Sequence, residues 1–224
     1  MKARLPFLVP LWRRARYSGK SPERVFTDEF RRNRRVWKGR GSSSGPGSSL
    51  AQTAAVRRAL PGLLKELGCR SLLDAPCGDF FWMRHVDLGV DYTGGDIVEK
   101  LVEENRRRYG RPGRRFVRLD LLRDRLPPAD LVLCRDCLVH LSFEHVALAL
   151  ANIRESGNRY LLTTTFIGHD RNDDILTGLW RPINLQRPPF NFPEPLRLID
   201  EESPLADQRD KRLGLWKTEA IPAG

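Results

Sequence analysis

Three acidic residues stand where short apolar runs end in the first half of the sequence. Asp74 ends "SLLD", Asp96 ends "YTGGD" 22 positions later, and Asp120 ends "FVRLD". The carboxyl ends of parallel strands meet at one edge of a sheet, where nucleotide-type cofactors bind. Gly78 follows Asp74 in a turn where a missing Cβ lets the backbone approach a ligand. Asp96 lies where a βαβ unit places a ribose-binding carboxylate, so the spacing predicts a cofactor site.

Alternating strand and helix patterns position these acids. The predicted strands are residues 71–74, 91–94, 115–119, 131–134 and 159–166. The predicted helices are residues 50–67, a segment from about Trp82, and residues 98–109 and 143–156. This alternation predicts an α/β fold with a doubly wound, mostly parallel sheet. Two further strands, around Leu196 and Leu215, are predicted to form an antiparallel pair at the C-terminal end.

The order of these motifs resembles the class I S-adenosylmethionine-dependent methyltransferases over roughly residues 45–220. The resemblance implies a seven-stranded, Rossmann-like sheet and S-adenosyl-L-methionine as the cofactor. In that family the first turn lies against the methionine half, the second acid binds both ribose hydroxyls, and the third lies near the adenine. The cofactor-binding residues that this implies are Asp74, Ala75, Gly78, Asp96, Asp120, Leu121 and Arg135. A nicotinamide-binding Rossmann domain is a weaker alternative, because the turn lacks the Gly-x-Gly-x-x-Gly fingerprint of such domains.

The resemblance also implies where the methyl group meets its acceptor. Residues just beyond the fourth strand face the methyl group in this fold, which nominates Asp136 and His140 in "CRDCLVHL" as catalytic residues. With a reference pKa near 6.5, His140 could deprotonate a hydroxyl acceptor. The alternative is that His140 only packs at a helix start. Methyl transfer from a sulfonium needs positioning and desolvation rather than a metal, so no metal site is predicted.

Charge is concentrated at the N-terminus. Of the 224 residues, the first 40 hold 13 Lys or Arg and 3 acids, whereas the other 184 hold 26 bases and 25 acids. We therefore predict a basic N-terminal arm, residues 1–36, and a methyltransferase domain, residues 37–224. The arm could contact RNA, anionic lipid or an acidic partner, or be merely solvated, because Arg outnumbers Lys 32 to 7 throughout the chain. The Gly/Ser-rich residues 39–49 are either a lid over the cofactor or a flexible linker.

Nothing in the sequence predicts a membrane span. The apolar run from Leu5 to Trp12 is eight residues long, against the roughly 20 needed to cross a bilayer. The four cysteines lack the spacing of a disulfide framework, and Cys134 and Cys137 are interpreted as a reduced structural pair. These features predict a cytoplasmic protein, and they leave its oligomeric state open.

The leading functional hypothesis is a methyltransferase acting on a small-molecule or saccharide-like acceptor. The loop 177–193 interleaves aromatic and amide side chains, so it either walls the acceptor pocket or covers the sheet. The first alternative is an RNA methyltransferase that holds phosphate with the basic arm, although nucleic acid is not the favoured partner. The second is a non-catalytic protein that binds S-adenosylmethionine.

Overall fold

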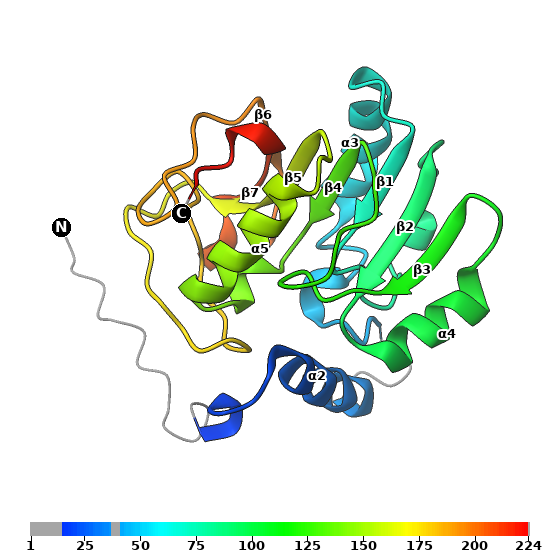
Figure 1. Ribbon diagram of the computed structural model, residues 1–224, viewed down its shortest axis with the longest axis horizontal. Helices are drawn as coiled ribbons and strands as arrows, with labels where there is room; N and C mark the ends of the chain where they lie inside the picture. The colour runs from blue at the N-terminus through cyan, green and yellow to red at the C-terminus, as the bar shows by residue number, and fades with distance from the viewer. Residues whose placement is uncertain (1–14, 37–40, 224) are drawn as a thin grey trace.

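A seven-stranded sheet forms the centre of the protein (Figure 1). The structure is a computed structural model that describes residues 15–36 and 41–223, so the apolar run from Leu5 to Trp12 lies outside it. The strands are β1 (Ser71–Asp74), β2 (Asp91–Asp96), β3 (Arg114–Arg118), β4 (Leu131–Cys134), β5 (Tyr160–Phe166), β6 (Arg197–Asp200) and β7 (Lys211–Lys217). Their order is β3-β2-β1-β4-β5-β7-β6.

The pairing confirms the predicted architecture. Strands β1 to β5 pair in parallel, and β7 pairs antiparallel with both β5 and β6. The central strands are apolar on both faces: Leu72 and Leu73 of β1 and all of β4 are buried, as expected for parallel strands covered on both sides. The strand order reverses at β1: β2 and β3 lie on one side of it, and the chain then returns to place β4 and β5 on the other side. This reversal opens a crevice at the carboxyl ends of the strands.

Helices cover both faces of this sheet. On one face, α3 (Ala54–Glu66) packs beside β6 and α4 (Glu99–Tyr109) packs against β2 and β3, within one apolar cluster. On the other face, α5 (Phe143–Glu155) packs against β4 and β5. The Ser142 hydroxyl caps α5 by accepting a hydrogen bond from the backbone N–H of His145, which satisfies one of the unpaired donors of the first turn. No helix in the described ranges is both long and apolar enough to span a bilayer.

The predicted helix from about Trp82 is wrong. A single 3₁₀ turn, Met83–His85, stands in its place. Phe80, in the turn before it, adopts a left-handed φ of 56° and packs edge to face on Phe116. The turn ends at Val86, whose backbone is extended (φ −109°, ψ 124°), and Gly89 has a left-handed φ of 64°, so the chain does not continue as a helix.

The N-terminal helix α2 (Pro22–Val36) lies across the carboxyl edge of the sheet, in dark blue at the bottom of Figure 1. Val25 packs with Leu179, and Phe30 packs with Leu101 at the start of α4. The predicted boundary between an arm and a domain at residue 36 stays a prediction. The described part of that arm contacts the rest of the fold through these apolar side chains.

Candidate active site

A cavity of about 570 Å³ lies at the carboxyl edge, bounded by the strand ends, by α2 and by residues 43–48. Its volume falls in the usual range for small-molecule sites. All of the site residues that the sequence predicts line this cavity: Asp74, Ala75, Gly78, Asp96, Asp120, Leu121, Arg135, Asp136 and His140. The structure therefore brings together side chains from four strand ends.

The turn after β1 forms the floor of the cavity. Gly78 has a left-handed φ of 54°, and a Cβ there would collide with the Ser44 hydroxyl. The Asn105 amide of α4 donates to the Gly78 carbonyl at 2.7 Å and fixes the turn from below. A residue with a side chain would prevent this close approach of the turn and the covering segment.

Asp96, at the end of β2, is held as a hydrogen-bond acceptor. Its Oδ2 accepts from the Gly78 N–H at 3.1 Å, and its Oδ1 accepts from the Val98 N–H at 3.0 Å. Burial raises the pKa of Asp96 to about 6, although both N–H groups favour the ionised form. A carboxylate has about four acceptor positions, so one position on each oxygen is left for a ligand. At the next strand end, Asp120 accepts from the Leu122 N–H at 3.0 Å.

Asp74 is fully enclosed at the end of β1. The Tyr92 hydroxyl donates to its Oδ2 at 2.7 Å. Burial raises the pKa of Asp74 to about 7, and the nearby Asp96 adds to the shift, whereas Tyr92 and Arg135 oppose it. An ordinary aspartate ionises near pH 4, so the folded protein holds a proton here that the unfolded chain releases.

The raised pKa of Asp74 predicts that Asp74→Asn changes stability in a pH-dependent way. Between about pH 4 and pH 7 the unfolded state releases the proton first, so the free energy of unfolding of the wild type falls as pH rises. The variant keeps an acceptor for Tyr92 and has no carboxyl to ionise. Relative to wild type, we expect it to gain at least about 1 kcal/mol at pH 8 and little at pH 4. Urea unfolding without cofactor at both pH values tests this, and an equal effect at the two values would contradict it.

Asp79 anchors the Gly/Ser-rich segment over the cavity. Its carboxylate accepts from the Ser42 hydroxyl at 2.7 Å and from the backbone N–H and hydroxyl of Ser43 at 2.6 and 3.0 Å. In return, the Asp79 N–H donates to the Ser44 hydroxyl at 2.9 Å. These contacts place residues 42–44 against the turn after β1, which favours the lid over the linker. The sequence signal was an acid directly after Gly78 together with a serine run, and sequence reasoning missed their pairing.

Asp79→Ala should therefore release this segment. Three serine donors lose a charged acceptor, and hydrogen bonds to charged groups contribute about 1.5 to 3 kcal/mol. We expect faster proteolysis within residues 41–49 and cofactor affinity lowered by about tenfold, because residues 43–48 line the cavity. Asp87→Ala, an exposed acid in the same connection, is the control. Unchanged proteolysis in Asp79→Ala would show that other contacts hold the segment.

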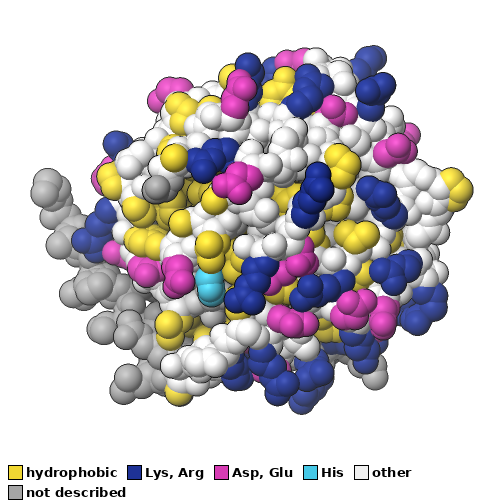
Figure 2. Space-filling view, in the orientation of Figure 1, with side chains coloured by type: hydrophobic (Ala, Val, Ile, Leu, Met, Phe, Trp, Pro, Cys, Tyr) yellow, Lys and Arg dark blue, Asp and Glu magenta, His cyan; other side chains and the backbone are white. Residues whose placement is uncertain are grey.

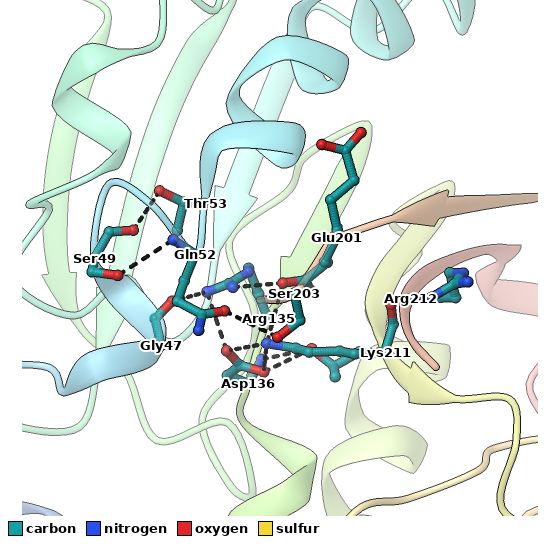
Figure 3. A network of polar contacts seen from close by, with 12 residues as sticks. Gly47, Ser49, Gln52, Thr53, Arg135, Asp136, Glu201, Ser203, Lys211 and Arg212 are labelled. Carbon is teal, nitrogen blue, oxygen red and sulfur yellow. Dashed lines mark hydrogen bonds and ion pairs between the residues drawn. The ribbon is translucent and has the colours of Figure 1, made fainter. Parts of the chain in front are cut away.

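Beyond β4, four charged side chains form a network in which Arg135, Glu201 and Lys211 are buried and Asp136 is partly exposed (Figure 3). Arg135 pairs with Glu201 at 2.6 Å and with Asp136 at 3.1 Å. Lys211 of β7 pairs with Asp136 at 2.7 Å and with Glu201 at 3.1 Å. Arg135 also donates to the Gly47 carbonyl at 2.9 Å, which links the network to the covering segment. Sequence reasoning missed Glu201 and Lys211 because both follow the β5 strand by more than 30 residues.

The network determines the charge of Asp136. Burial alone would raise its pKa, but Arg135 and Lys211 outweigh burial and hold the pKa at about 2. Asp136 is therefore a carboxylate at every physiological pH and a poor proton acceptor. Its backbone has a left-handed φ of 52°, and its N–H donates to the Thr164 hydroxyl at 2.8 Å. These contacts fix the charge in place.

His140, unlike Asp136, can accept a proton at neutral pH. It ends the 3₁₀ turn Leu138–His140, and its Nδ1 lies 2.9 Å from the Leu179 carbonyl oxygen. A carbonyl can only accept, so Nδ1 carries the hydrogen and Nε2 keeps a lone pair. Burial lowers the pKa of His140, which keeps the ring neutral at pH 7. His140 can thus accept a proton at Nε2.

The remaining wall comes from α2 and from the loop after β5. Phe26 and Glu29 of α2 line the cavity, and the Tyr17 hydroxyl donates to Glu29 at 2.8 Å. In the loop 177–193 Trp180 lines the cavity, whereas Phe190 and Phe192 are buried in the core. The loop thus covers the core and contributes to the cavity wall, and its role in holding an acceptor stays a prediction. The α2 residues were not predicted to belong to the site, because a Gly/Ser-rich stretch separates α2 from the predicted methyltransferase domain in the sequence.

No protein-family model and no curated protein matches this sequence. The fold, however, matches solved methyltransferase structures. One is a 1,6-didemethyltoxoflavin N1-methyltransferase of Burkholderia thailandensis with bound 1,6-didemethyltoxoflavin and S-adenosylhomocysteine. It is 18% identical, with a TM-score of 0.56 over 96% of this chain and 92% of that one. Human N-acetylserotonin methyltransferase in complex with S-adenosylmethionine is 13% identical, with a TM-score of 0.53 over 90% of this chain and 68% of that one. The chain has the fold of the class I S-adenosylmethionine-dependent methyltransferases.

Proposed function

We propose that this protein is a cytoplasmic S-adenosylmethionine-dependent methyltransferase acting on a small-molecule or saccharide-like acceptor. The observation that carries the proposal is the shared cavity of Asp74, Asp96 and Asp120 with His140. The strand-end acids suit a nucleoside cofactor, and a neutral histidine with a proton-accepting nitrogen suits an acceptor hydroxyl or amine. Both solved methyltransferases described above are named for small-molecule acceptors.

The residues present fit the cofactor. Asp96 keeps one acceptor position on each carboxylate oxygen, which matches the two ribose hydroxyls, and the turn at Gly78 leaves space that a Cβ would fill. Asp120 and Leu121 would lie near the adenine. Arg135, which is buried and has an Nε without a hydrogen-bond partner among the described residues, would lie near the methionine half. When bound, S-adenosylmethionine supplies an electrophilic methyl group.

His140 would act on the acceptor. Its Nδ1–H bond to Leu179 fixes the ring, so that Nε2 can take the proton that the acceptor oxygen or nitrogen loses. Asp136, held as an anion by Lys211 and Arg135, would orient the acceptor rather than take its proton. Phe26 and Trp180 offer apolar faces, and Glu29 offers a polar contact, to a small organic or sugar-like molecule.

A labelling experiment tests the acceptor class. The full chain is incubated with methyl-labelled S-adenosylmethionine and with either the low-mass fraction or the RNA fraction of a cell extract. We expect label in low-mass products, formed at least about 100-fold more slowly by His140→Ala. Label confined to RNA would favour an RNA methyltransferase instead. Cofactor binding without label in either fraction would favour the non-catalytic alternative.

A further inference from the structure

Residues 41–224 have a net charge close to zero, but their charges are unevenly distributed along the sequence. Residues 106–125 contain nine Arg and two Asp. The rest of residues 41–224 contains 17 bases and 23 acids. A basic segment of about 20 residues is therefore set against an acidic remainder of the same domain.

These residues lie on one edge of the molecule. They run from the last turn of α4 through β3 to the loop before β4, and β3 is the edge strand of the sheet. The exposed arginines of this basic edge are Arg106, Arg107, Arg108, Arg111, Arg115, Arg118, Arg123 and Arg125. The basic edge thus follows β3 from its amino end to the rim of the cavity, where Asp120 and Leu122 lie.

Little within the structure neutralises the basic edge. Arg118 pairs with Asp124 at 3.1 Å, and Asp120 is buried. Five arginines make no side-chain hydrogen bond or ion pair with any described residue: Arg107, Arg108, Arg111, Arg123 and Arg125. By contrast, Arg24 and Arg32 of α2 pair with acids of the same helix. Five guanidinium groups are therefore available to an external anion.

The helix α2 extends this surface. Arg34 of α2 pairs with Glu104 of α4, which brings the C-terminal half of α2 beside α4. The side chains of Arg31 and Arg35 are exposed there. Figure 2 shows Lys and Arg side chains over α2 and α4 in the lower right of the view, with some acidic side chains between them.

Protection of the edge strand accounts for only part of this pattern. Charged residues on an edge strand prevent edge-to-edge aggregation, and Arg115 and Arg118 of β3 suffice for that. The arginines at 107, 108 and 111 precede β3, and those at 123 and 125 follow it. Arginines at both ends of the strand, on α4 and in the loop before β4, are not needed for that protection.

We propose that the basic edge binds the phosphodiester backbone of a nucleic acid. Guanidinium groups form bidentate hydrogen bonds with phosphate, and the segment contains arginine but no lysine. The elongated arrangement suits a chain of phosphates. A membrane fits less well, because no large apolar side chain of residues 99–125 is exposed for insertion. The nucleic acid is a partner held beside the cavity, whatever the methyl acceptor is.

Neutralising the five available arginines tests this. The full chain with Arg107→Gln, Arg108→Gln, Arg111→Gln, Arg123→Gln and Arg125→Gln is titrated into a labelled 30-nucleotide single-stranded RNA, by fluorescence anisotropy at several salt concentrations. Binding should weaken by about tenfold or more at 100 mM salt, and the salt slope should fall by about 0.7 for each phosphate that the variant no longer neutralises. The matched control neutralises five exposed arginines outside the basic edge: Arg58, Arg171, Arg187, Arg197 and Arg209. It should change affinity by less than about twofold.

The basic N-terminal residues are identical in all three proteins, so their contribution cancels. Cofactor affinity and melting temperature are measured in parallel, and both should match the wild type. Equal affinity of the wild type and the five-site variant for RNA would overturn the proposal. Displacement of the RNA by polyglutamate as efficiently as by unlabelled RNA would overturn it too, in favour of an acidic protein. Displacement by single-stranded DNA would support a phosphodiester site shared by both nucleic acids.

Discussion

Asp96→Ala is expected to weaken S-adenosylmethionine binding at least tenfold while the fold stays intact. The carboxylate would accept both ribose hydroxyls, and each such charge-assisted bond contributes about 1.5 to 3 kcal/mol. The Gly78 and Val98 N–H groups would also lose their acceptor, which loosens the turn that the cofactor contacts. Titration calorimetry with purified variants measures the dissociation constant.

Asp130→Ala is the matched control for this prediction. Asp130 likewise accepts two backbone N–H bonds, from Arg70 and Ser71, but at the opposite edge of the sheet. It should lower stability without changing cofactor affinity. An unchanged dissociation constant in Asp96→Ala, or an equal loss in both variants, would show that Asp96 does not contact the ribose.

His140→Ala is expected to lower turnover by about 10² to 10⁴-fold and to leave cofactor affinity nearly unchanged. The variant loses Nε2 as proton acceptor, and the neighbouring Asp136, with a pKa of about 2, cannot replace it. Because burial lowers the pKa of His140, wild-type kcat/KM should rise with pH below 6.5 and level off at neutral pH. The variant should lack that rise.

The control here is His145→Ala. His145 lies on α5, and its Nδ1 contacts the Thr177 hydroxyl at 2.6 Å, outside the cavity wall. It should retain turnover within a small factor. Full activity in His140→Ala, with an acceptor found by the labelling experiment, would reduce His140 to a packing residue and leave positioning as the mechanism.

The strand ends were predictable from the sequence because each combines a local signal with a simple geometric rule. Leu72 and Leu73 predict a buried strand, Asp74 ends it, and parallel strands align their ends at one edge. The same rule placed Asp96 and Asp120 at that edge, and the resemblance to the methyltransferases placed His140 there. The false helix from Trp82 shows the limit, since no local signal marks the extended backbone of Val86 that ends the 3₁₀ turn.

The contacts between distant segments were not predictable in the same way. Asp79 and Ser43 are 36 positions apart, and Arg135 and Glu201 are 66 apart. No periodicity or sequence motif links the two residues of either pair. The basic edge was not predicted for a different reason. The charge was averaged over residues 41–224, which cancelled it, and only the edge position of β3 shows that α4, β3 and the loop before β4 meet at one side of the sheet.

The central claim is that the cavity binds S-adenosylmethionine, and direct titration of the full chain tests it most simply. Calorimetry is carried out with S-adenosylmethionine, with S-adenosylhomocysteine and with a nicotinamide dinucleotide, after treatment with a metal chelator. We predict one site per chain for the first two ligands, loss of at least about tenfold in affinity in Asp96→Ala, and no binding of the dinucleotide. Binding of the dinucleotide with no heat from either S-adenosyl compound would contradict the account.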